Sequence, residues 1–579
     1  MALEAQRKKL CKKEDAEREI SRLARRDQRY ARWMCGRFLK KATEKLLNCF
    51  ALTVANAPIN QNLKGGKSMP RKPKAKNALS AGERVALYEA ERAEKKSKAG
   101  IEVNLDITDA APSTATNQAE IEKPKIVLPK PQHATVKVDF SIPMGEIKPM
   151  HAMCNGPVSY GADLSPLFKE IGVPYVRFDE TDTAISSYAI DISRIFKDIH
   201  ADPQNEKSYD FSYTDRYVAA AHNCGARVIF RLGESVDRMH SGKQVSVPED
   251  IDLFVDVCAN VVRHYNDYWA NGYAYGIEYF EIWSAGNTAR DSDMSKTLEL
   301  YRRTATAVKL IDSDIKVGGM CFSEDSALRE FVKYCRKSRA PLDFITVSSF
   351  DSDPADVESR IANIIPILHN LGFNETEIIV GAWNYIDKDA IGKIPLEKAL
   401  SSSDSRFAEA KRRIFEEQGS VKGAAYALSL MIALAKIREA KMACYYDAQP
   451  YLSAWCAISD RFGNPEKPFY AFKAYGDIYR AGREIWAVSE QTDGYAHTGV
   501  YAIGAEGNGA YYVLISSFDG CGMVDLRLDS IPSDVYTAEI YMLDGVKNMT
   551  LADTLPISGS KKRMLLNISQ YGAALVKLY

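Results

Sequence analysis

Short apolar runs alternate with helical segments from about residue 136 to residue 485. The helical segments include 164–170, 253–265, 298–310, 357–371 and 423–438. Because each strand is followed by a helix, the pattern predicts repeated βα units that close into a parallel (β/α)8 TIM barrel. The predicted strands are one near Met153, Tyr175–Asp179, Arg227–Leu232, Ile277–Trp283, Ile315–Cys321, Asp343–Phe350, Glu377–Trp383 and Met442–Tyr446.

The pattern changes beyond about residue 486, where short alternating runs are separated by turn residues. The predicted strands are Gly499–Ile503, Ala510–Phe518, Val524–Leu528, Ala538–Leu543 and Ala573–Leu578. Alternation with period two is typical of half-buried strands. Residues 486–579 are therefore expected to form an antiparallel β-sandwich after a barrel at residues 136–485.

The first 135 residues differ from both regions. Residues 1–63 form a basic helical N-terminal arm by pattern, in which apolar residues recur among dense Lys and Arg. Residues 64–135 are rich in Lys, Ala, Pro, Ser and Thr, which predicts a linker with one helix. Two interpretations of the arm stay open: packing on its own domain, or contact with a protein or an anionic membrane face.

Composition narrows the class of partner. The formal net charge is zero and 46% of the residues are apolar, so nothing draws the chain as a whole to nucleic acid. The 11 cysteines are scattered and the 8 histidines are dispersed, which predicts free thiols, no metal site and no cofactor. No secretion signal or long apolar span is found, so we expect a cytoplasmic protein, or one peripheral to a membrane through its arm.

Two predicted strands end on alanine next to tryptophan. The first run is Tyr279 to Asn287, which reads YFEIWSAGN, and the second is Ile378 to Tyr385, which reads IIVGAWNY. Alternation along the first strand would direct Glu281, Trp283 and Ala285 to the same side, into the barrel mouth. Ala285 and Ala382 are therefore expected at the rim of one cavity.

These runs resemble glycoside hydrolase family 39, the retaining barrel glycosidases typified by β-xylosidases and α-L-iduronidases. The resemblance extends from about Pro149 to Tyr579. The matching segments are 167–179, 279–287, 343–346, 445–447, 455–465 and 468–472.

The resemblance implies a role for each strand end. A Trp-Asn-Glu-Pro motif supplies the general acid/base in the family, and this chain has Trp283, Ser284, Ala285 and Gly286 there. A Glu-Trp-Asn motif supplies the nucleophile, and Ala382 takes the glutamate position here. A third motif, His-x-Tyr, is replaced by 348–350, which reads SSF. Alanine offers no proton, lone pair or charge, so the chain as written is expected to bind sugar without cleaving it.

Three interpretations of the paired alanines stay open. The first is deliberate Glu→Ala replacement at both positions of a retaining glycosidase, and it is favoured because drift would not spare both flanking tryptophans. The second is a natural pseudo-glycosidase that acts as a glycan-binding module. In the third, other carboxylates perform a different reaction, the candidates being Glu281, Asp179, Asp182, Glu234 and Asp447.

The remaining candidate residues are expected to bind the carbohydrate by hydrogen bonding or ring stacking. Trp383 and Tyr446 are the preferred stacking residues, and Arg177 with Asp179 could equally form a structural ion pair. The full set of candidate binding residues is Arg177, Asp179, Glu281, Trp283, Ser284, Asn287, Trp383, Asn384, Tyr385, Tyr446, Asp447 and Trp455.

Overall fold

The computed structural model describes residues 133–159, 162–179, 189–235, 247–284, 294–388, 405–449, 455–490, 499–520 and 522–579. The predicted N-terminal arm, nearly all of the predicted linker, Asp182, Ala285 and Asn287 lie outside these residues. Within the described part of the chain, no helix is long and apolar enough to cross a membrane.

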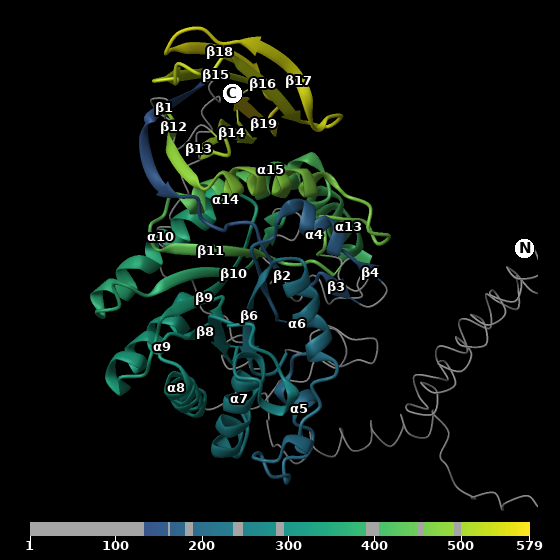
Figure 1. The fold of residues 1–579 in the computed structure, drawn as a ribbon, viewed down its shortest axis with the longest axis vertical. Coiled ribbons are helices and arrows are strands. Elements are labelled where there is room, and N and C mark those ends of the chain that lie inside the picture. The colour runs from purple at the N-terminus through teal and green to yellow at the C-terminus, as the bar shows by residue number, and fades with distance from the viewer. Residues whose placement is uncertain are drawn as a thin grey trace, which may run out of the picture. The chain divides into compact units, whose positions relative to one another are not determined.

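Eight parallel strands close into a barrel, as the sequence predicts (Figure 1). Neighbouring strands follow the order β10-β11-β2-β5-β6-β7-β8-β9, and all pairs are parallel. The strands are β2 (Ala152–Cys154), β5 (Tyr175–Arg177), β6 (Arg227–Leu232), β7 (Tyr279–Ile282), β8 (Lys316–Phe322), β9 (Phe344–Asp351), β10 (Glu377–Tyr385) and β11 (Ala440–Tyr445). Each predicted barrel strand is confirmed to within a few residues.

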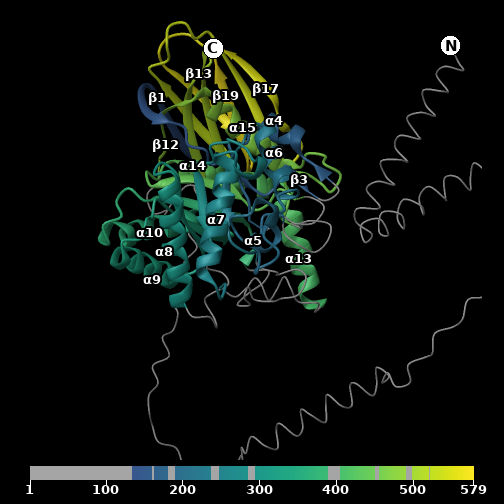
Figure 2. The same ribbon diagram turned by 60° about the horizontal axis from the view of Figure 1, so that its bottom comes forward.

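Helices connect the barrel strands and cover their outer side (Figures 1 and 2). A short hairpin of β3 (Val158–Ser159) and β4 (Ala162–Asp163) follows β2. The helices are α4 (Ser165–Ile171), α5 (Ile192–Ile195), η1 (Glu206–Ser208), α6 (Thr214–Asn223), α7 (Ile251–Asn266), η2 (Trp269–Asn271), α8 (Met294–Ile311), α9 (Asp325–Ser338), α10 (Pro354–Asn370), α13 (Ser405–Gln418), α14 (Val421–Ala435) and α15 (Lys467–Ala481).

The C-terminal region is a nine-stranded sheet in the order β17-β16-β19-β14-β13-β12-β1-β15-β18. Its strands are β1 (His133–Glu146), β12 (Arg483–Ser489), β13 (Val500–Gly507), β14 (Ala510–Phe518), β15 (Met523–Asp529), β16 (Thr537–Leu543), β17 (Asn548–Pro556), β18 (Lys562–Asn567) and β19 (Tyr571–Leu578). All pairs are antiparallel except β1 with β15.

Strand β1 corrects the predicted domain boundaries. The sequence pattern places residues 133–146 at the end of the linker and the start of the barrel, but they lie inside the C-terminal sheet between β12 and β15. After the barrel, the chain re-enters this sheet with β12 at Arg483 rather than at residue 486. The physical reason is that the alternating side chains Ala134, Val136, Val138 and Phe140 are buried in the core of this sheet.

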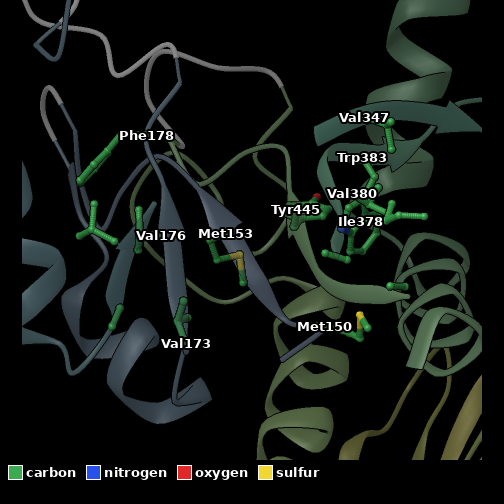
Figure 3. Packing of buried hydrophobic residues seen from close by; sticks show 14 of the residues in the cluster. Met150, Met153, Val173, Val176, Phe178, Val347, Ile378, Val380, Trp383 and Tyr445 are labelled. Carbon is green, nitrogen blue, oxygen red and sulfur yellow. The ribbon is translucent and has the colours of Figure 1, made fainter. Parts of the chain in front are cut away.

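Two apolar layers hold the barrel. Residues that face the lumen, including Tyr175, Ile229, Tyr279 and Ile379, pack on one another. Their neighbours face the helices, and Figure 3 shows Val176, Ile378, Val380 and Trp383 in this outer layer. Alternation therefore sends every second residue to the lumen.

Candidate functional site

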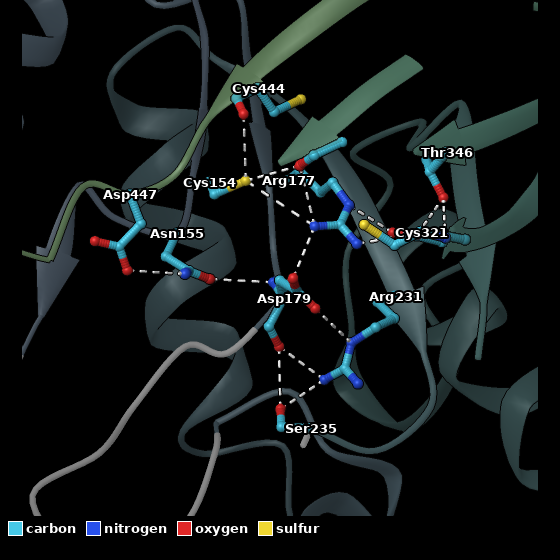
Figure 4. A network of polar contacts seen from close by, with 12 residues as sticks. Cys154, Asn155, Arg177, Asp179, Arg231, Ser235, Cys321, Thr346, Cys444 and Asp447 are labelled. Carbon is cyan, nitrogen blue, oxygen red and sulfur yellow. Dashed lines mark hydrogen bonds and ion pairs between the residues drawn. The ribbon is translucent and has the colours of Figure 1, made fainter. Parts of the chain in front are cut away.

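Arg177 lies at the centre of a polar network at the carboxyl ends of the barrel strands, where active sites of this fold form (Figure 4). Its side chain is fully buried. Nε and Nη2 donate to the two carboxylate oxygens of Glu281 at 2.6 and 3.0 Å, and Nη1 donates to Asp179 Oδ2 at 2.9 Å. Burial alone would lower the pKa of Arg177, but Asp179 and Glu281 outweigh it and raise that pKa well above its ordinary value.

Glu281 is held from a second side by Thr346 on β9. The Thr346 hydroxyl donates to Glu281 Oε1 at 2.5 Å and accepts from the backbone N–H of Cys321 at 2.7 Å. Both Glu281 oxygens are therefore engaged. The pair of Arg177 and Glu281 is a buried, bidentate ion pair that fixes the strand ends.

A second arginine, Arg231 on β6, lies on the other side of Asp179. Its Nη2 donates to the backbone oxygen of Asp179 at 2.7 Å, to Asp191 Oδ1 at 2.9 Å and to the Ser235 hydroxyl at 2.7 Å. The carboxylate of Asp191 also accepts from the backbone N–H and hydroxyl of Ser235. Burial raises the pKa of Asp191 although Arg231 opposes it.

Ala382 faces the lumen because β10 is irregular at Gly381. The pairing of β10 with β9 shifts register between Val380 and Ala382, so that Gly381 and Ala382 follow each other on the inner side. A Cβ at Gly381 would lie 3.2 Å from Thr346 Cβ and 3.3 Å from Arg177 Nε, so the close approach favours glycine. Ala382 retains 5% exposure.

Aromatic side chains pack on the same side of the mouth as Ala382. Phe350 and Tyr446 are half-buried against the lumen cluster that contains Ala382. Trp455 lies 5.2 Å from Phe350 and 6.2 Å from Tyr446 between ring centroids. The site thus has a charged side on β5 to β7 and an aromatic side on β9 to β11.

The two tryptophans next to the alanines do not face the lumen, contrary to the prediction for Trp283. Trp283 has a positive φ of 62°, which breaks the alternation after Glu281, and its ring packs on Phe254 of α7. Trp383 is fully buried against Tyr445 and Phe472. Both belong to the outer core, so neither ring is placed to stack on a ligand in the mouth.

Other candidate residues have structural contacts. The Asn384 side-chain amide donates to the backbone oxygens of Tyr446 and Trp455 at 2.7 and 3.0 Å, and thereby anchors the aromatic loop. The Tyr385 hydroxyl donates to Glu417 at 2.7 Å. Asp447 is buried and accepts from Gln449 Nε2 at 3.0 Å, while Ser284 is buried beside Trp283.

Several network residues were missed by the sequence reasoning, namely Asn155, Asp191, Arg231, Ser235, Cys321 and Thr346. One signal was available. Arg231 interrupts the apolar run of its strand, and alternation places it on the same side as Ile229, in the lumen. The contribution of Asp191 and Ser235 could not be found this way because they lie in loops that meet only in the fold.

The described residues contain no group of three or more His, Cys, Asp or Glu side chains placed to hold a metal ion. The cysteines at the mouth are thiols. Burial raises the pKa of Cys154 well above its ordinary value, and it raises the pKa of Cys444 to about 12. Both thiols are therefore uncharged at neutral pH.

Part of this chain is similar in sequence to known proteins. The sequence profile of "Glycosyl hydrolases family 39" matches residues 158–367. A β-xylosidase of Geobacillus stearothermophilus is 28% identical over 176 residues, which cover 27% of this chain and 34% of the relative. A β-xylosidase of Caldicellulosiruptor saccharolyticus is 33% identical over 81 residues, 13% of this chain and 16% of the relative. The match thus spans about a third or less of these curated relatives.

Solved structures share the fold over a longer range. A glucosidase from Croceicoccus marinus superposes with a TM-score of 0.62 at 19% identity, and covers 77% of this chain and 98% of its own. A β-xylosidase from Caulobacter crescentus CB15 superposes with a TM-score of 0.55 at 16% identity, over 77% and 99% of the two chains. Over residues 158–367, the barrel of this chain is therefore related by sequence to glycosyl hydrolase family 39.

Proposed function

We propose that the barrel mouth binds a carbohydrate and that this chain, with Ala285 and Ala382 at the positions of proton donor and nucleophile, does not hydrolyse it. The observation that carries the proposal is the lumen-facing methyl of Ala382, which lies between the charged network of Arg177 and the aromatic side chains of Phe350 and Tyr446. Polar groups on one side and rings on the other suit a sugar, which has hydroxylated edges and an apolar face.

The same site would make a retaining glycosidase if both positions carried glutamate. One glutamate would protonate the leaving oxygen while the other attacked the anomeric carbon, and water would then release the sugar from the enzyme. A methyl group can neither donate the proton nor attack the anomeric carbon. The loss of both carboxylates removes the reaction and leaves the groups that hold the sugar.

The double reversion Ala285→Glu with Ala382→Glu tests the catalytic half of the proposal. We expect aryl glycosides, screened as β-xylosides, β-glucosides and α-L-arabinofuranosides, to be hydrolysed by the double variant and not by the chain as written. Each single reversion is the matched control, since double displacement needs both carboxylates. Hydrolysis by the unchanged chain would contradict the proposal.

A second candidate is a natural glycan-binding module. It is favoured by Phe350, whose ring packs 5.9 Å from Tyr446 and 5.2 Å from Trp455 and so closes an apolar surface beside Ala382. A glutamate at 382 would meet this surface at a desolvation cost. Sugar binding by both forms without activity in the double revertant would favour this candidate.

Other carboxylates are less suited to catalysis. Glu281, Asp179 and Asp447 each accept hydrogen bonds within the site and act as scaffold. Glu234 accepts from the backbone N–H and hydroxyl of Ser193, and burial, followed by the charge of Asp191, raises the pKa of Glu234 to about 8. Glu234 therefore bears a proton at neutral pH, but its hydrogen bonds hold it to α5.

A further inference from the structure

The guanidinium of Arg231 is buried with part of its donor capacity unused. Nη2 donates to Asp179, Asp191 and Ser235, whereas Nη1 and Nε have no hydrogen-bond acceptor among the residues that the structure describes. Asp179 Oδ1 lies 3.7 Å from Nε, too far for a hydrogen bond. Figure 4 shows the third nitrogen of Arg231 without an interaction to any residue drawn.

The surrounding carboxylates cannot supply the missing acceptor as they stand. Glu281 is the register partner of Arg231 on β7, but its two oxygens are engaged by Arg177 and Thr346. Asp191 is turned to Nη2 and Ser235. A buried charged donor without an acceptor is costly, so such a group is maintained where another molecule completes it.

Asp179 is the more accessible residue of the pair. Its side chain is 17% exposed, and that of Arg231 is not exposed at all. A sugar hydroxyl suits this pair, since it can donate to a carboxylate and accept from a guanidinium at the same time.

We propose that Arg231 contacts the ligand and sets its specificity: its Nε donates to a sugar hydroxyl that in turn donates to Asp179 Oδ1, which lies 3.7 Å from Nε. This rests on the proposed function. The shared position selects the class of ligand, because the group placed there must accept from the Arg231 guanidinium and donate to the Asp179 carboxylate. A hydroxyl does both, whereas a uronate carboxylate has no proton to donate to Asp179, so the structure assigns a neutral sugar to the site.

The test measures binding of xylotriose, cellotriose and trigalacturonate to the full chain by calorimetry. We expect a neutral trisaccharide to bind, and Arg231→Met to weaken that binding by about tenfold or more, as loss of a hydrogen bond to a charged group does. Arg227→Met is the matched control, because Arg227 lies at the other end of the same strand. The control should bind as the unchanged chain does.

A double-mutant cycle on ligand affinity tests the coupling that a shared hydroxyl requires. If Arg231 and Asp179 share one hydroxyl, Arg231→Met and Asp179→Asn will have strongly non-additive effects on affinity for the neutral sugar. Additive effects would overturn the shared hydroxyl. Should the methionine variant fail to fold, Arg231→Lys replaces it in the cycle, and we expect this variant to bind the neutral sugar more weakly than the unchanged chain does.

The other outcomes are equally decisive. Equal neutral-sugar binding by the Arg231→Met and Arg227→Met variants would overturn the inference and leave the proposed function standing. Preferred binding of trigalacturonate would overturn the neutral class. Failure of the unchanged chain to bind any of the glycans that the proposed function implies would contradict both.

Discussion

At the scale of single residues, the burial of His151 makes the stability of the fold depend on pH. The ring is fully buried between Tyr475 and Tyr479, with Nε2 donating to the backbone oxygen of Gly172 at 3.2 Å. Burial therefore lowers the pKa of His151 from 6.5 to about 3. The folded chain keeps the ring neutral where the unfolded chain protonates it.

We expect this histidine to make the protein sensitive to acid. Because the pKa of His151 is depressed in the folded state, its contribution to stability is fully present above pH 6.5 and is lost as the pH falls toward 3. Over that window, His151→Gln should flatten the pH dependence of the urea unfolding free energy by up to about 1.4 kcal/mol per pH unit. His200→Gln, at an exposed position, is the control. An unchanged slope in the His151 variant would refute the prediction.

At the scale of elements, the irregularity in β10 decides what faces the lumen. Gly381 O accepts from Arg177 Nη1 at 3.2 Å and from the Cys154 thiol at 2.9 Å, so the strand is held close to the network. This proximity brings the network and Ala382 to one mouth. The site therefore depends on the backbone of one strand as well as on side chains.

Gly381→Ala should show this dependence. The added methyl would press on Thr346 and on Arg177, both of which are tied to Glu281, so we expect a loss of about 1–3 kcal/mol in urea unfolding. Gly545→Ala is the control, since a Cβ there meets nothing within 4 Å. Equal stability of the two variants would mean that β10 accommodates the added methyl without loss of stability, and would contradict the prediction.

At the scale of the whole molecule, hydrogen bonds and packed helices join the barrel to the C-terminal sheet. Helix α14 is buried on all sides, and the Ser429 hydroxyl donates to that of Ser516 on β14 at 2.9 Å. Lys467, at the start of α15, donates to the backbone oxygens of Asp544 and Lys547 and to Asn548 Oδ1, between 2.7 and 3.0 Å. Both contacts join a barrel helix to the sheet.

We expect Lys467→Met to lower the unfolding free energy by about 1–3 kcal/mol, because backbone acceptors lose a charged donor. Lys473→Met, on the same helix, is the control, since Lys473 contacts only Asp477 of its own helix at 3.6 Å among the ion pairs of the described residues. Tryptophan fluorescence and circular dichroism should report one transition for the unchanged chain. Separate transitions would show that the two regions unfold independently.

The strands and helices of the barrel could be predicted from the chain alone, because apolar periodicity is a local property that reflects burial. The lumen-facing position of Ala382 does not follow in this way, because it depends on the register shift of β10 at Gly381. Strand β1 could not be assigned, since alternation shows that a strand has a buried face but not which sheet it joins. Its partners β12 and β15 come more than 300 residues later in the chain.

The orientation of the tryptophans and the hydrogen-bond partners of Arg231 were decided only by the tertiary structure. A positive φ at Trp283 turned its ring to the helices. Strict alternation cannot predict this orientation, because it assumes an extended backbone at every residue. Arg231 acquired its partners from α5 and from loops that are distant in sequence. The sequence by itself determined which residues are buried along each element; the fold decided which polar groups meet, because a hydrogen bond needs geometry that no local pattern contains.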